Sequence, residues 1–450
     1  MDSKKYGGLW WLPENPERKI SGTLSYEYGK GSILSLDGVF LEDTEDEYHE
    51  IILGDDRGKL ITLVSCFRTN FQIQQFEDSR QFKHSEFHVS LFCIGFHFAK
   101  RKELKFKSMT VRYSHLRKWL SGVFNLSQWD ENENEYVLKV KKPPVKEIVL
   151  DKFGLSIKGV VSSEHGSYHD FYERYASITI DMTDETPLDE LFLIVYHLKN
   201  FLSLATGEKI SILTMNGEKT CLKPYERIEI FSFQTLGEKG SKDRFAWYPL
   251  PIEYQTISER LEFYLQNWFN MIEKYEPMYE LFFGTLSERV YPVNDFLNLS
   301  QALEAYHCRK FENRIVSDDL FSKQLPQFLR IIDEFPKEHR PEFQSKVEFM
   351  NRKSLRRRTK ELFEKYGQIF KIFIEKEEDF IPKFVDTRNY YTHYDPKKEK
   401  PAGIMEIPFL TENLRFILMV ILFEEMGFEA KQIEQIIHRY CRNRIKAIYQ

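Results

Sequence analysis

The sequence predicts an α+β protein in which a β-rich N-terminal half is followed by an all-α helical bundle. As far as about residue 250, short apolar segments rich in Val, Ile, Phe and Tyr alternate with Gly, Asp and Asn turn signals, a pattern typical of antiparallel sheet. Beyond Pro251, apolar residues recur at intervals of three and four, as on the buried face of a helix. A chain of 450 residues also exceeds one ordinary core. We therefore expect domains at 1–255 and 256–450.

The first half contains a hairpin signal. The apolar segments 51–53 and 60–64 flank the stretch 54–59, which is rich in Gly and Asp and predicts a turn. Strand-like alternation occurs again at 86–92 and 177–181. Alternation of this kind is compatible with a sandwich, a barrel or two small sheets, so the fold of this half stays open at the level of sequence.

Helical spacing dominates the second half. Leu261, Leu265, Trp268 and Ile272 would share one buried face, and comparable patterns follow, so we expect a compact bundle. The longest apolar run, 416–423, is far shorter than the roughly 20 residues that span a bilayer. The N-terminus also lacks the apolar core of a secretory signal, so we expect a soluble, cytoplasmic protein. The predicted helices are 188–204, 261–272, 296–306, 362–373, 410–423 and 433–448.

Charge and cysteine content narrow the expected partners. The net charge is −5, but residues 351–450 hold 20 Lys and Arg against 15 Asp and Glu, a local +5 that leaves −10 for residues 1–350. An anionic partner should therefore approach the C-terminal end. The five cysteines form no CxxC pair, which favours reduced thiols over a metal site. We expect neither a metal nor another cofactor.

Residues 388–393 read Arg-Asn-Tyr-Tyr-Thr-His near a predicted helix end. On a helix Asn389 and His393 share a face, whereas Arg388 lies about 140° from His393 and must reach around it or meet another chain. An arginine and a histidine held close together would suit the cleavage of RNA without a metal. That reaction needs proton transfer and stabilisation of a crowded phosphorane. Histidine suits the first task and arginine the second, and the product would carry a 2′,3′-cyclic phosphate. The alternative is structural: capping of carbonyls or pairing with Asp386 and Asp395.

This motif resembles that of the HEPN superfamily, whose ribonucleases carry Arg-x4-His in a helical bundle, often with Asn after the Arg. The stretch 295–307 resembles the opening helix of the HEPN domain in ApeA-type abortive-infection proteins. The stretches 8–13 and 20–24 resemble the start of that family's N-terminal domain. The likeness covers most of the chain.

The resemblance implies a homodimer in which both copies of the motif face one cleft and cleave RNA in antiphage abortive infection. It assigns catalysis to Arg388, Asn389 and His393, and a supporting role to Glu304 and His307. It also implies that infection triggers cleavage of host RNA, with transfer RNA as a candidate substrate. The N-terminal half would act as a sensor, with a phage protein as a candidate trigger.

A basic run at 352–360 has six cations among nine residues and no acid. Such runs bind phosphate backbones, so we expect RNA to contact Lys353, Arg356, Arg357 and Arg358. A solvated helix face, or pairing with the acidic segment 375–379, is the alternative.

Two other classes of function stay open. A HEPN-like bundle can serve as a non-catalytic scaffold that binds RNA or protein, because fold does not fix function. A metal-dependent nuclease in the N-terminal half is the second, although no carboxylates cluster at a strand end. His84 and His88 have the spacing of helical metal ligands but lie in a segment that reads as strand.

Overall fold

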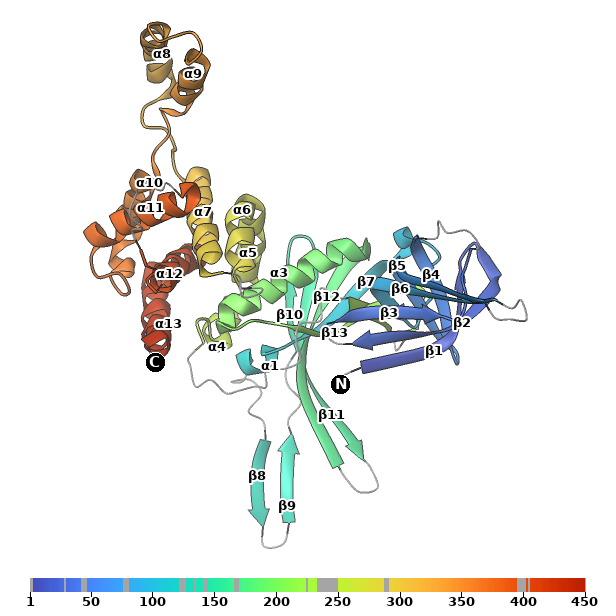
Figure 1. Cartoon of the computed structure of the whole chain (residues 1–450). Coiled ribbons are helices and arrows are strands. Elements are labelled where there is room, and N and C mark those ends of the chain that lie inside the picture. The colour runs from blue at the N-terminus through green and yellow to red at the C-terminus, as the bar shows by residue number, and fades with distance from the viewer. Residues whose placement is uncertain are drawn as a thin grey trace. The chain divides into compact units, whose positions relative to one another are not determined.

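The computed structural model describes residues 3–449 apart from 28–29, 42–46, 76–80, 121–126, 133–134, 141–144, 166–169, 224–225, 233–249, 287–290, 395–401 and 404. Contacts along the chain separate two compact units, Met1–Glu262 and Phe263–Gln450. The first is built mainly of strands and the second of helices, which confirms the predicted fold class (Figure 1).

Among the described residues of the first unit, six strands close into an antiparallel barrel. Each has two hydrogen-bonded neighbours within the ring, because β5 pairs with β6 as well as with β4. Closure removes the free edges at which a sheet can pair with other chains. In order round the ring the strands are β6 (Gln81–Ile94), β3 (Gly31–Leu36), β2 (Asn15–Glu27), β1 (Ser3–Leu12), β4 (Tyr48–Asp56) and β5 (Lys59–Gln75).

The barrel encloses an aromatic and aliphatic core. Trp10 is fully buried, and a Cβ atom built on Gly54 would lie 2.3 Å from its ring, so only glycine fits at that position of β4. Inward-facing residues along the strands fill the interior, as in other small barrels. This core includes Tyr6, Leu24, Leu34, Leu36, Phe40, Ile52, Leu63, Phe87, Val89 and Phe92.

The hairpin predicted from sequence is formed by β4 and β5. Its turn is tighter than the expected stretch 54–59, since pairing continues to Asp56 and Lys59 and leaves only Arg57 and Gly58 between the strands. Both turn residues have positive φ, 54° and 85°, the combination that matches the twist of a two-residue hairpin. The Gly58 amide also donates to Asp55 Oδ1 at 2.7 Å.

A second sheet continues from the barrel, because β6 also pairs with β14. Helix α3 (Leu188–Thr206) lies against β7 and β12 and ends at Gly207 in the left-handed conformation, as its spacing and the glycine predict. The order from β6 is β14 (Ile228–Ser232), β13 (Ile212–Glu218), β7 (Lys105–Tyr113), β12 (Asp170–Pro187), β11 (Gly154–His165) and β10 (Lys146–Val149). Shorter elements are η1 (Arg101–Glu103), α1 (Leu116–Trp119) and the hairpin β8 (Ser127–Asn132) with β9 (Glu135–Val140).

Helix α12 (Ile407–Glu425) is the centre of the helical unit. It is buried on nearly every side and packs against α7 and α13, so the apolar run 416–423 belongs to a protein core. In the described part of the chain, no helix combines the length and apolar character needed to cross a membrane. Further helices of this unit are α5 (Leu261–Lys274), α6 (Glu276–Gly284), α7 (Pro292–Lys310), α10 (Leu355–Phe370), α11 (Glu377–His393) and α13 (Ala430–Tyr449). The helices α4 (Tyr254–Ile257) and η2 (Ser258–Arg260) belong to the end of the first unit.

Between α7 and α10 the chain forms a helical hairpin of α8 (Asp318–Asp333) and α9 (Arg340–Phe349) (Figure 1). Its two ends run side by side. The Ile315 amide donates to Asn351 O at 2.9 Å, and the Lys353 amide donates to Asn313 O at 3.0 Å. The buried Asn351 side chain bonds both backbone groups of Val316 at 3.0 Å. These bonds form a stalk at the base of the hairpin.

Candidate active site

Helix α11 carries the motif Arg388 to His393 in its last two turns. Acidic residues at 377–379 occupy its first turn, where they interact favourably with the helix dipole. The helix ends after His393 because Tyr394 adopts the left-handed conformation, with φ 47°, and its amide donates to Tyr390 O at 2.7 Å. The motif therefore stands at a helix terminus, as the sequence predicts.

Packing divides the motif into an anchored part and an exposed part. Phe384, Thr387 and Tyr391 lie on the buried face of α11, which contacts α7 and α10. Arg388 and Asn389 are half-buried beside this face, whereas His393 is exposed. The guanidinium is thus held by the bundle, and the imidazole is accessible from solvent.

Glu304 of α7 binds Arg388 directly. Its Oε1 accepts from Arg388 Nη2 at 2.7 Å, and its Oε2 accepts from Arg358 Nη1 of α10 at 3.2 Å. Asn389 Oδ1 accepts from Arg388 Nη1 at 3.3 Å. One carboxylate therefore links α7, α10 and α11, and Arg388 finds its partners within its own chain. Asn389 thus contacts the arginine of the motif.

His307, one turn along α7 from Glu304, belongs to a second cluster. It is fully buried, stacks on Phe311 and lies 2.9 Å from Glu361 Oε2 through Nε2. Glu361 is an acceptor, so Nε2 carries the proton and Nδ1 presents a lone pair. Among the described residues Nδ1 has no hydrogen-bond partner.

Electrostatics keep His307 neutral and Glu361 ionised. Burial lowers the pKa of His307, and the charges of Arg358 and Lys353 act in the same direction against the opposing effect of Glu361. Burial alone would raise the pKa of Glu361, but hydrogen bonds from Lys353 and His307 outweigh it and lower that pKa. The pair is a neutral imidazole beside a carboxylate.

The basic run spans the start of α10, where Ser354 caps the helix by accepting from the Arg357 amide at 3.3 Å. Lys353 and Arg358 are only 15% and 11% exposed and are paired with Glu361 and Glu304. Arg356 and Arg357 are 46% and 56% exposed. The run thus has an inner pair that holds helices together and an outer pair that faces solvent.

Where the structure describes them, the acidic residues named as alternative partners of the motif and of the basic run do not form the contacts considered for them. Asp386 pairs with Arg356 at 3.6 Å instead of with Arg388. Asp395 lies outside the described residues. Among the described residues, the acidic partners of the basic run are Glu304, Glu361, Glu364 and Asp386, whereas the alternative had named the segment 375–379.

Glu361 is the polar residue of this site that sequence analysis missed. It follows Arg357 by four residues and therefore shares its helical face, and the two form an ion pair at 3.0 Å. That spacing was visible in the sequence, but the contact with His307 depends on how α7 and α10 pack and was not.

No metal cluster is found within the described residues: no three or more His, Cys, Asp or Glu side chains are arranged to hold an ion. His84 and His88 lie on strand β6, where residues four apart are separated by roughly 13 Å. His84 instead contacts Ser35 Oγ at 3.4 Å.

Two family models match the chain. Residues 5–268, more than half of it, match the ApeA N-terminal domain 1, and residues 297–432 match the Apea-like HEPN domain. No curated protein and no solved structure matches. The second match contains Glu304, His307, Arg388, Asn389 and His393. HEPN domains are generally ribonucleases, which supports a nuclease-like role in abortive infection. The chain belongs to the ApeA-type family of abortive-infection proteins, with an ApeA N-terminal domain and a C-terminal HEPN domain.

Proposed function

We propose that the protein is a metal-independent endoribonuclease that cleaves host RNA in antiphage abortive infection, with transfer RNA as its substrate class. The observation that carries the proposal is the end of α11, where an anchored Arg388 is followed by an exposed His393. The match to the Apea-like HEPN domain supports it.

In this proposal His393 transfers protons and Arg388 binds phosphate. A base removes the proton from a ribose 2′-hydroxyl, whose oxygen attacks the adjacent phosphorus. The 5′-oxygen leaves as an acid protonates it, so one RNA strand becomes a 2′,3′-cyclic phosphate end and a 5′-hydroxyl end. Imidazole can perform either proton transfer near neutral pH, and the fixed charge of arginine stabilises the phosphorane.

The reaction needs both an acid and a base, and one chain carries one exposed motif histidine. A homodimer with two copies of the motif in one cleft would supply both. His393 is free of the bundle interior, which leaves it available to such a cleft. Asn389 would act on the arginine, because its Oδ1 accepts from Arg388 Nη1 and limits the orientation of the guanidinium.

Arg356 and Arg357 would guide RNA towards this site. Both stand in the first turn of α10, where they add to the positive end of the helix dipole, and both are about half exposed. Lys353 and Arg358, also expected to contact RNA, would act mainly by holding Glu361 and Glu304 in place.

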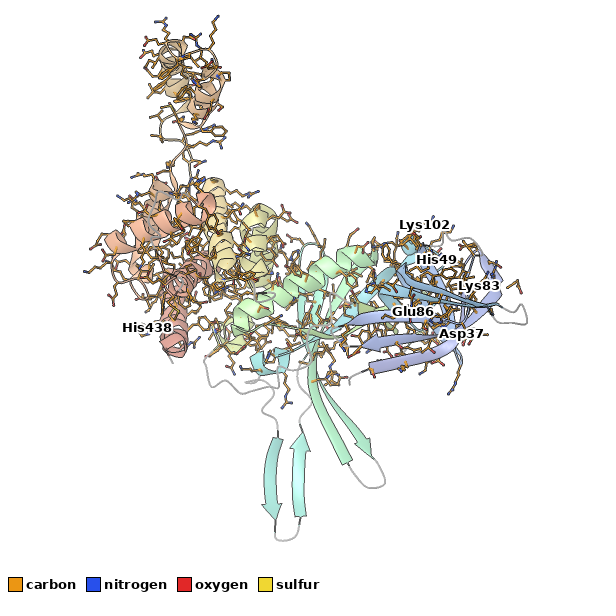
Figure 2. The ribbon with its side chains drawn as sticks, in the orientation of Figure 1. Asp37, His49, Lys83, Glu86, Lys102 and His438 are labelled. Carbon is orange, nitrogen blue, oxygen red and sulfur yellow. The ribbon has the colours of Figure 1, made fainter. Side chains whose placement is uncertain are left out.

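The test is cleavage of purified RNA in EDTA by the wild-type protein, by His393→Ala and by His438→Ala. His438 is an exposed histidine of α13 and serves as the matched control (Figure 2). We expect cleavage by wild type and by the control, with cyclic-phosphate ends, and loss of at least about 100-fold in His393→Ala. Activity that EDTA abolishes would favour a metal-dependent nuclease.

If purified protein is silent, each variant is assayed again with extract from infected cells, since a triggered enzyme needs its trigger. A phage protein bound by the N-terminal domain is the trigger we propose. Cleavage that appears with wild type and His438→Ala, but not with His393→Ala, supports the proposal. RNA cleavage that stays at the level of the infected extract alone, with all three proteins, would favour a non-catalytic HEPN scaffold.

A further inference from the structure

A cavity of about 750 Å³ opens on the outer wall of the barrel in the N-terminal unit. Its lining comes from β4, β5, β6 and β14, from η1, from the start of β7, and from the end of β12 with the first two turns of α3. A volume of this size is typical of sites for small molecules. The motif on α11 contributes no residue to the lining.

Part of the cavity lining is polar. Glu50, Ser65 and Ser90 lie side by side on neighbouring strands, because the pairs that flank them are in register across β4, β5 and β6. Ser65 has φ 53°, and its hydroxyl accepts from Arg101 Nη1 at 3.1 Å. A serine in the left-handed region within a strand is uncommon, and such outliers cluster at ligand sites. The carboxylate and hydroxyl oxygens of these three residues suit a ligand that carries hydroxyl groups.

One wall is apolar and includes an aromatic ring. Val64 and Leu91 are buried residues of β5 and β6 that lie outside the barrel core cluster. Half-buried Phe192 of α3 stands among the lining residues as well. A flat ring system could pack against this wall, since aromatic faces stack readily on planar groups.

The rim is cationic. Arg101 connects β5 to α3, because it donates to the Ser65 hydroxyl and also pairs with Asp189 of α3 at 3.2 Å. Lys102 and Lys105 are exposed and form no ion pair with another described residue. The positive charge of a lysine side chain is favourable for binding phosphate.

From these three surfaces we infer that the cavity binds a phosphorylated nucleotide. The phosphate would contact Lys102 and Lys105, the sugar hydroxyls would face Glu50 and Ser90, and the base would pack on the wall with Phe192. No one of these features selects a nucleotide, but together they match its anionic, hydroxylated and flat aromatic parts. The inference is independent of RNA cleavage.

The experiment is calorimetric titration of the full chain with each of the four ribonucleoside 5′-monophosphates and 5′-triphosphates. The corresponding nucleosides and inorganic phosphate are titrated in parallel. Proteins compared are wild type, Lys102→Gln/Lys105→Gln, and Lys5→Gln/Lys59→Gln, a control with two exposed lysines that do not line the cavity. An Arg388→Ala variant is included as well, because nucleotide binding that depends on the HEPN motif would be weakened in it.

We expect at least one nucleotide to bind wild type, the Lys5→Gln/Lys59→Gln control and Arg388→Ala alike, and about tenfold more weakly to the Lys102→Gln/Lys105→Gln variant. Its nucleoside should bind about tenfold more weakly than the nucleotide. Absence of nucleotide binding, or binding that survives loss of both rim lysines, would overturn the inference. Inorganic phosphate that binds as tightly as every nucleotide would also overturn it, because the apolar wall would then contribute nothing. Thermal unfolding of each variant checks that it is folded.

Discussion

Arg388 Nη2 lies 2.7 Å from Glu304 Oε1, so the cation of the Arg-x4-His motif on α11 is held by a carboxylate on α7. The same carboxylate binds Arg358 through its other oxygen. The motif is therefore positioned by α7, which is distant from it in sequence, and by α10, the helix that precedes α11. Substitutions at the motif and at its partners should consequently have different effects on activity and on stability.

Replacing Arg388 with lysine should lower RNA cleavage by about 100-fold while leaving the fold intact. Lysine keeps the positive charge and can still reach Glu304, but it lacks the planar fork that binds two oxygens of a phosphorane. Single-turnover cleavage in EDTA measures the loss, and thermal unfolding measures the fold. Full activity in Arg388→Lys would show that charge alone is sufficient.

Replacing Glu304 with glutamine should destabilise the helical unit by roughly 1 to 3 kcal/mol, since charge-assisted hydrogen bonds to Arg388 and Arg358 are weakened and two guanidinium groups lose their counter-charge. Urea unfolding measures the change. Glu364→Gln is the control, because Glu364 is 63% exposed and its 4.0 Å contact with Arg357 should contribute little. Equal stability of the two variants would contradict the bridging role.

Reversing both outer cations, in Arg356→Glu/Arg357→Glu, should reduce the salt dependence of RNA binding. Each lost phosphate contact lowers the slope of log K against log salt by about 0.7 on single strands. Binding measured by fluorescence anisotropy across a salt series gives the slope. Lys371→Glu/Lys431→Glu makes the same change of charge at exposed positions outside the run, so an equal effect there would point to net charge alone.

Acidification should destabilise the helical unit through His307. Its pKa is lowered in the folded state, so below about pH 6.5 the unfolded chain binds a proton that the folded chain does not. The stability from neutral His307 is therefore lost as pH falls below that value. Glu361, whose pKa is also lowered, loses its contribution in a more acidic range.

Chemical unfolding of wild type and of His307→Gln at pH 7.5 and pH 5.5 tests this dependence. The difference in unfolding free energy between the two pH values should be smaller in His307→Gln, because the titrating group is gone. Contributions of other histidines, such as half-buried His197 with its pKa lowered to about 4, are the same in both proteins. An unchanged pH dependence would exclude His307 as its source.

Local patterns in the sequence predicted much of this fold. Period-two and period-3.6 spacing identified the β-rich half and the helices α3, α5, α7, α10, α12 and α13, although not α6, α8 or α9. Gly207 marked the end of α3. Closure of the barrel was not predictable, since it depends on the pairing of β5 with β6 around a ring, and alternation reports only which face of a strand is buried.

In the candidate site, too, local features could be predicted from the sequence and long-range contacts could not. Arg388 and His393 could be placed at a helix end from spacing and resemblance. The contact of Arg388 with Glu304 joins residues 84 positions apart, and the contact of His307 with Glu361 joins residues 54 positions apart. Such pairs depend on helix packing, which no local pattern encodes.

The stalk beneath α8 and α9 holds the two ends of this helical hairpin together where it meets the rest of the HEPN unit. The backbones of Arg314 and Arg352 form an antiparallel β-bridge across the stalk. The chain therefore leaves the bundle and returns to it at nearly one point. The length of the inserted hairpin can therefore change without moving the end of α7 relative to the start of α10. Glu304 and Glu361 sit on those two helices, which means that an insertion here can diversify while the polar clusters around Arg388 and His307 keep their geometry.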